Sequence, residues 1–151
     1  MAFKVFLGCS MRGGYDFVSK DELVKLFNLV EKMGLILVTK HQIDANVYKD
    51  EANLKPNQIH DRDFKWLKEA DLGIFEISNP SLGVGGEISD IIKLGKPVLC
   101  LAKEGLGDEV SAYVRGKENS EFISNLFEYK VYSDINDIQN IILNFIEKIK
   151  N

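Results

Sequence analysis

The chain has 151 residues, 45% of them apolar and 28% charged, which is enough for one buried core and too short to suggest two domains. A formal net charge of −4 without any run of five like charges argues against a nucleic-acid-binding face. No apolar stretch approaches a membrane span and the first residues lack a signal-peptide layout, so we expect one cytoplasmic domain over residues 1–151.

Short β-rich runs alternate with longer segments of helical period, which is typical of a parallel sheet covered by helices on both faces. The pattern predicts a single-domain α/β fold, a Rossmann- or flavodoxin-like three-layer sandwich with a five-stranded parallel sheet. The polar segment 40–56 has no clear period and is expected to be either a functional lid or an ordinary surface excursion. We expect strands at 3–8, 35–39, 72–76, 98–102 and 128–132, and helices at 20–33, 57–70, 85–94 and 135–150.

The loop after the first strand reads GCSMRGG over residues 8–14 and is the first candidate site. In open parallel sheets ligands bind beyond the carboxyl ends of the strands. Glycines let the backbone approach a ligand, exposed amides can hold phosphate oxygens, and Arg12 could add a bidentate contact. The segment matches neither common phosphate-loop fingerprint, so a plain glycine-rich turn is the alternative.

The loop after the third strand, NPSLGVGGE over residues 79–87, must turn sharply and then begin a helix. Three glycines within four residues are unfavourable in a helix and indicate close approach of a ligand. Ser81 could bind an anion near the positive end of the following helix. Glu87 is expected in the first turn of that helix, where the alternative is an acid that merely stabilises the helix start.

An acidic residue on an apolar helix stripe marks the segment IHDRDFKWL over residues 59–67. Desolvation there would raise the pKa of Asp63 and let it hold a proton for donation. The alternative is that Asp63 faces solvent and pairs with Lys65 or Arg62. Trp66 is expected to belong to the core rather than to a ligand platform.

A serine and an arginine after the fourth strand, and the two cysteines, are the remaining candidates. Ser111 and Arg115 follow the fourth strand and could contact phosphate or a partner subunit, or be plain surface residues. Cys9 and Cys100 lie in apolar runs without metal-type spacing and are expected to be buried hydrophobes. No metal or organic cofactor is implied.

Taken together, these segments resemble the 2'-deoxynucleoside 5'-monophosphate N-glycosidase family, a branch of the nucleoside 2-deoxyribosyltransferase superfamily. The resemblance covers most of the chain and rests on five marks in the family's order and spacing. They are GCSMRGG, Thr39-Lys40-His41, IHDRDFKWLKEAD, NPSLGVGGE and SAYVRG.

The resemblance implies hydrolysis of the N-glycosidic bond of a nucleoside 5'-monophosphate by a retaining double displacement. Glu87 would be the nucleophile, and Asp63 the acid that assists departure of the base. A homodimer is implied, because Ser111 is expected to come from a second subunit. The substrate-binding positions carried over are Phe6, Gly8, Ser10, Arg12, Gly13, Gly14, His41, Ser81, Gly83 and Ser111, with His41 either a base contact or a structural histidine.

One position departs from the family pattern. The deoxynucleotide enzymes have a tyrosine in the first strand, whereas this chain has Phe6, which cannot donate a hydrogen bond. Related hydrolases of ribonucleotides such as CMP carry phenylalanine there, so the sequence leaves open whether the substrate sugar is ribose or deoxyribose. It also leaves the base open. Tyr15 could supply a hydroxyl instead. The alternatives are a nucleoside 2-deoxyribosyltransferase and, from another class, a non-catalytic nucleotide-binding module.

Overall fold

The computed structural model describes residues 2–12, 14–40 and 47–151. Its five strands are all parallel and lie in the order β2-β1-β3-β4-β5. The order in which strands are added to the sheet therefore switches sides between β1 and β3. Ligands of such sheets bind at that switch point. The strands are β1 (Lys4–Cys9), β2 (Ile36–Leu37), β3 (Leu72–Glu76), β4 (Val98–Lys103) and β5 (Phe127–Tyr132).

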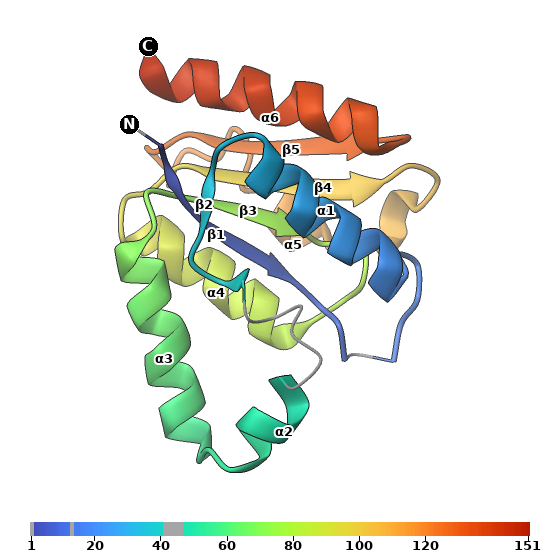
Figure 1. Cartoon of the computed structure of the whole chain (residues 1–151). Coiled ribbons are helices and arrows are strands. Elements are labelled where there is room, and N and C mark those ends of the chain that lie inside the picture. The colour runs from blue at the N-terminus through green and yellow to red at the C-terminus, as the bar shows by residue number, and fades with distance from the viewer. Residues whose placement is uncertain (1, 13, 41–46) are drawn as a thin grey trace.

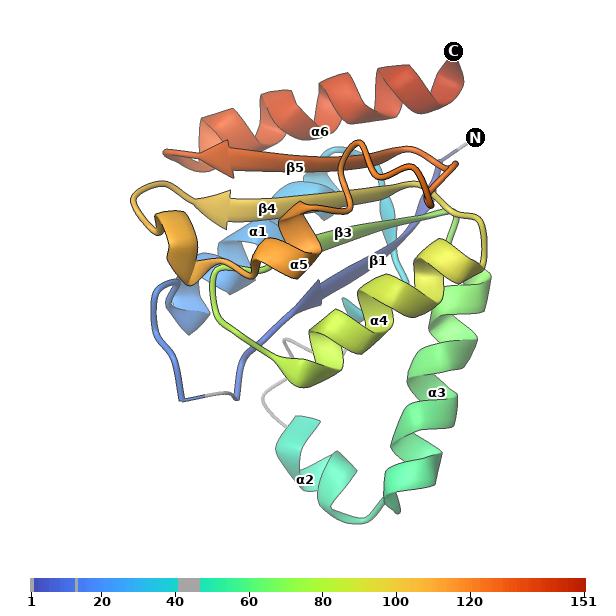
Figure 2. The same cartoon turned by 180° about the vertical axis from the view of Figure 1, so that it is seen from behind.

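Helices cover both faces of the sheet, as Figures 1 and 2 show from opposite sides. One core cluster joins the sheet to α1 and α6, and the other joins it to α3 and α4. The expected three-layer sandwich is therefore confirmed. The helices are α1 (Lys20–Lys32), α2 (Val47–Ala52), α3 (Pro56–Glu69), α4 (Leu82–Lys93), α5 (Ala112–Arg115) and α6 (Ile135–Lys150).

Local sequence signals explain the ends of α1 and the start of α6, the two helices that cover one face of the sheet. Ser19 and Glu22 form a reciprocal capping box at the start of α1, and Gly34 follows its end with a φ of +82°, which favours glycine. Asp134 caps α6 by accepting from the N–H groups of Asn136 and Asp137. Both helices bury apolar stripes at spacings of three and four residues.

Strand β2 and helices α2 and α4 differ most from the sequence-based expectation. Strand β2 has only two residues instead of 35–39, because the hydroxyl of Thr39 donates to Leu7 O (2.8 Å) and accepts from Leu7 N–H (3.2 Å) in place of backbone pairing. Within the polar segment 40–56, residues Val47–Ala52 form helix α2. Helix α4 begins at Leu82 rather than at residue 85, so its glycines are helical.

None of the helices in the described ranges combines the length and the hydropathy that a bilayer-spanning helix needs.

Candidate active site

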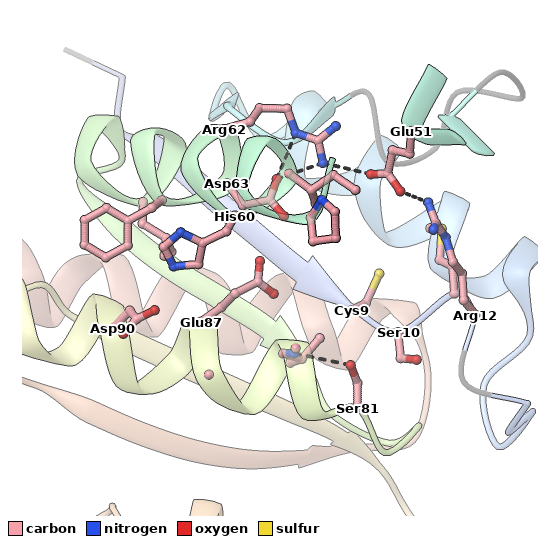
Figure 3. A pocket seen from close by; sticks show the side chains of 18 residues that line it. Cys9, Ser10, Arg12, Glu51, His60, Arg62, Asp63, Ser81, Glu87 and Asp90 are labelled. Carbon is pink, nitrogen blue, oxygen red and sulfur yellow. Dashed lines mark hydrogen bonds and ion pairs between the residues drawn. The ribbon is translucent and has the colours of Figure 1, made fainter. Parts of the chain in front are cut away.

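A cavity of about 510 Å³ lies at the switch point of the sheet. Its walls come from the loop after β1, from α2, from α3 and from α4, and Figure 3 shows the side chains that line it. Five of the predicted site residues contribute charged or hydroxyl groups to this one cavity. They are Ser10, Arg12, Asp63, Ser81 and Glu87.

Ser81 begins helix α4 and so determines where Glu87 lies. Its hydroxyl accepts from the N–H of Val84 (3.2 Å) and caps the helix, which compensates for the glycines that follow. Glu87 consequently falls in the second turn, not in the first turn as expected, and the first turn of α4 contains no acidic residue. Glu87 therefore does not stabilise the start of this helix.

The carboxyl group of Glu87 points into the cavity toward α3 (Figure 3). Burial raises its pKa to about 8, with further upward contributions from the negative charges of Asp63 and Asp90, while the guanidinium of Arg62 opposes the shift. Near neutral pH this carboxyl group therefore holds a proton much of the time. Such a perturbed acid in a cavity is a frequent mark of a functional site.

Asp63 lies on α3 opposite Glu87 and also lines the cavity (Figure 3). Its carboxylate accepts from Arg62 Nε (3.0 Å) and forms an ion pair with the second guanidinium nitrogen (2.9 Å). The sequence offered an acid on the apolar stripe and a solvent-facing acid paired with Lys65 or Arg62 as alternatives. In the structure Asp63 is half-buried and paired with Arg62. Trp66 joins the core on this side, and its ring lies 4.7 Å beneath the Arg62 guanidinium.

Glu51, which no sequence pattern singled out, lies on α2 and lines the cavity. One of its carboxylate oxygens accepts from Arg12 and the other from Arg62 (2.8 Å). The four side chains thus form a continuous chain of ion pairs along one wall, from Arg12 through Glu51 and Arg62 to Asp63 (Figure 3). These contacts join Glu51 to residues that are 39 and 11 positions away in the sequence, so no local pattern could have predicted them.

Hydroxyl and cationic groups gather at the end of the cavity beside the start of α4. Ser10 is buried, and Ser81 and Arg12 lie near it in Figure 3. Gly83 also lines the cavity. Gly14 has a φ of +75°, so the loop needs glycine there. Gly13 and His41 lie outside the described residues.

Phe6, Gly8 and Ser111 stand apart from the lining of this cavity. Phe6 is fully buried against Phe75, with ring centroids 5.7 Å apart, and a Cβ at Gly8 would lie 2.6 Å from the Phe75 ring. Ser111 caps α5 and lines a second cavity of about 730 Å³ on the other side of α4, which Ser81 also borders.

Neither cysteine thiol is suited to act as a nucleophile. Cys100 is buried in the core, and burial raises the pKa of the Cys9 thiol to about 12, which makes it a poor nucleophile. Across residues 2–12, 14–40 and 47–151, no group of three or more His, Cys, Asp or Glu side chains could hold a metal ion.

Proteins of similar sequence share most of the chain's length. A protein of Thermofilum pendens, described as a candidate 2'-deoxynucleoside 5'-phosphate N-hydrolase 1, is 38% identical over 136 residues, which is 89% of this chain and 88% of that protein. The 5-hydroxymethyl-dUMP N-hydrolase of Danio rerio is 31% identical over 141 residues, 93% of each chain. No protein-family model matches the sequence.

Solved structures of lower sequence similarity share the fold. The CMP N-glycosidase of Clostridium botulinum superposes with a TM-score of 0.63 at 22% identity, covering 94% of this chain and 98% of that one. A 2-deoxyribosyltransferase of Bacillus psychrosaccharolyticus gives a TM-score of 0.62 at 16% identity, over 91% and 90% of the two chains. The five-stranded α/β architecture is therefore the one found in these enzymes.

Proposed function

The chain belongs to the family of 2'-deoxynucleoside 5'-phosphate N-hydrolases, and we propose that it hydrolyses the N-glycosidic bond of a nucleoside 5'-monophosphate. The products are the free base and the sugar 5-phosphate. The observation that carries this proposal is the placing of Glu87 and Asp63 on facing helices of one cavity, with Ser10, Arg12 and Ser81 at its end. A glycosidase needs two such carboxyl groups, and a nucleotide-binding module does not.

Glu87 is proposed as the nucleophile. It first passes its proton to the Asp63 carboxylate, which faces it across the cavity. The freed Glu87 carboxylate attacks C1', the bond from C1' to the base nitrogen breaks, and the base leaves with the electron pair and takes the proton from Asp63. A glycosyl-enzyme ester remains on Glu87.

Water resolves this ester in the second step. Asp63 accepts a proton from the water, the oxygen attacks C1', and the bond between C1' and Glu87 breaks. Two displacements at the same carbon return the original configuration, which is a retaining mechanism. The Arg62 guanidinium, whose Nε donates to the Asp63 carboxylate at 3.0 Å, holds this carboxylate in place for the step.

The hydroxyl and cationic end of the cavity is proposed to bind the 5'-phosphate. Ser10 and Ser81 offer hydroxyl donors, Arg12 offers a guanidinium, and the first N–H groups of the 12-residue helix α4 provide a positive end for the anion. A transferase acting on unphosphorylated nucleosides has no use for this group of donors. The monophosphate is therefore the substrate form that the site supports best.

We also propose that the enzyme works as a homodimer, in which the partner's Ser111 reaches the phosphate end of the cavity. The surface around Ser111 supports this, because Leu82 is 99% exposed and Tyr113 80% exposed beside it. Light scattering after gel filtration tests the assembly. Replacing Leu82→Glu should give a monomer with reduced hydrolysis, and a fully active monomer would refute the shared site.

The central experiment incubates the protein with ribo- and deoxyribonucleoside 5'-monophosphates and their nucleosides, and measures free base by chromatography. Glu87→Ala should bind nucleotide but lose hydrolysis by several orders of magnitude, because the covalent route is gone. Glu69→Gln, which removes an exposed carboxylate at the end of α3 and outside this cavity, is the control. Unchanged turnover in Glu87→Ala would refute the assignment, and faster cleavage of nucleosides would favour the transferase.

Two finer predictions stay open. Comparing CMP with dCMP tests whether Phe6 in place of the family tyrosine selects ribose. The cytoplasmic location expected from the sequence is tested by fractionating cells that express the chain.

A further inference from the structure

Polar groups follow one another along α4 in the order of the parts of a nucleotide. Ser81 begins the helix at the phosphate end, Glu87 lies six positions or about 9 Å further along the axis, and Asp90 lies about 4.5 Å beyond that. All three line the same cavity, and Figure 3 shows them in this sequence along the helix. Given the proposed function, the phosphate and C1' are matched to the first two groups. The third group then lies where the base must extend.

Asp90 differs from the two proposed catalytic acids in its surroundings. Asp63 is held by Arg62, whereas no hydrogen bond or ion pair involves the Asp90 side chain among the described residues. It is close enough to Glu87 for its charge to contribute to the raised pKa of that group. Asp90 is half-buried at the cavity wall, so its oxygens can serve as acceptors for a ligand without breaking an existing contact.

An aromatic pair on α3 borders the same part of the cavity. The rings of His60 and Phe64 stack with centroids 5.9 Å apart and an interplanar angle of 20°, and both line the cavity with Asp90. Figure 3 shows His60 across the cavity from Asp90. Flat rings beside a lone acceptor suit a planar heterocycle that carries a donor on its edge.

We propose that Asp90 is a specificity-determining residue that selects a base with an exocyclic amino group, as in cytosine or adenine. An ionised carboxylate can only accept hydrogen bonds, and an amino group donates them. Uracil and thymine place a carbonyl oxygen where cytosine has its amino group, and that oxygen is repelled by the carboxylate. This inference rests on the proposed function and specifies its substrate class.

The test is a comparison of kcat/KM for CMP and UMP, and for dCMP and dUMP, in the full-length protein. We expect the amino-bearing nucleotide of each pair to be preferred about 100-fold or more, since sites built around a substrate donor strongly reject analogues that lack it. Asp90→Asn presents a donor as well as an acceptor and should bring the ratio below about tenfold, mainly through faster cleavage of UMP and dUMP.

The ratio of kcat/KM for two nucleotides cancels any effect of Asp90 on Glu87, because that effect is common to both substrates. Glu69→Gln again removes one exposed carboxylate away from the cavity and should keep the wild-type ratio. Equal cleavage of CMP and UMP by the wild type, or an unchanged ratio in Asp90→Asn, would overturn the inference alone. Cleavage of no nucleotide in the panel would overturn the proposed function and the inference with it.

Discussion

The side-chain amide of Asn79 pairs with both backbone groups of Val18, accepting from its N–H (3.2 Å) and donating to its carbonyl (2.9 Å). Asn79 is buried, and its amide nitrogen also lies 3.5 Å from the carbonyl of Ser10. One side chain therefore joins the loop after β1, which carries Ser10 and Arg12, to the loop after β3, which leads to Ser81. The two halves of the proposed phosphate site are held together by this amide.

Asn79→Ala should destabilise the fold and loosen the phosphate site at the same time. Loss of the amide leaves two buried backbone groups of Val18 unpaired, which costs about 2 kcal/mol, or roughly 4–8 °C in Tm for a chain of this size. KM for the monophosphate should rise more than kcat falls. Thermal unfolding and steady-state kinetics measure the two effects. Asn140→Ala, on the exposed face of α6, should change neither, and an unaltered KM in Asn79→Ala would contradict the positioning role.

Gly8→Ala tests whether packing alone requires glycine in β1. The added Cβ would lie 2.6 Å from Phe75 Cδ1 and 3.3 Å from the Phe6 ring, and both rings are fully buried. Overpacking of this kind costs about 1–3 kcal/mol, which denaturant unfolding measures. The double variant Gly8→Ala, Phe75→Leu replaces the obstructing ring by a smaller side chain. Its loss of unfolding free energy should be less than the sum of the losses in the two single variants. Full additivity would show that the glycine is required for another reason.

The regular elements were predictable because their signals are local. The apolar stripes of α1 and α6 repeat at three and four residues, and the buried strands are short apolar runs. Helix α4 was placed three residues late because its glycines disfavour a helix, whereas the Ser81 cap and the burial of Val84 and Ile88 override that preference. Helix α2 was missed because its sequence is polar and short.

The candidate site was predictable only as separate segments. The motifs pointed to Ser10, Arg12, Asp63, Ser81 and Glu87, and the parallel topology brings them to one edge of the sheet. The tertiary pairs inside the site had no counterpart in any local pattern. The ion pairs of Glu51 and the burial that perturbs Glu87 depend on how α2, α3 and α4 face one another.

Glu51→Gln should loosen α2 from the rest of the molecule. Lys49, Asp50 and Ala52 are exposed, whereas Glu51 is half-buried and ion-paired with Arg12 and Arg62. Removing its charge weakens both pairs, so amide hydrogen exchange in α2 should accelerate, on the order of five- to tenfold for about 1 kcal/mol of lost interaction. Asp50→Asn makes the same charge change on the exposed side of this helix. Equal exchange in the two variants would show that Glu51 does not anchor α2.

The raised pKa of Glu87 makes both activity and stability fall as pH rises. The proposed mechanism uses the one proton that Glu87 passes to Asp63, so kcat/KM should fall as pH rises through about 8, where Glu87 loses that proton. Between the ordinary carboxyl pKa of 4.5 and about 8 the folded state binds more protons than the unfolded state, so stability should fall as pH rises through this window.

Glu87→Gln removes the titrating group while keeping its shape, and should therefore separate these effects. At pH 8 the variant should be more stable than the wild type by at least ~1 kcal/mol, or roughly 2–4 °C in Tm, and the advantage should shrink toward pH 5. Thermal melts across pH 5–9 measure this difference. A constant difference in Tm over the whole range would mean that the Glu87 pKa is not raised, and the descending limb of the pH–rate profile would then need another group. Because Gln cannot form the glycosyl ester, the same variant should show no hydrolysis at any pH.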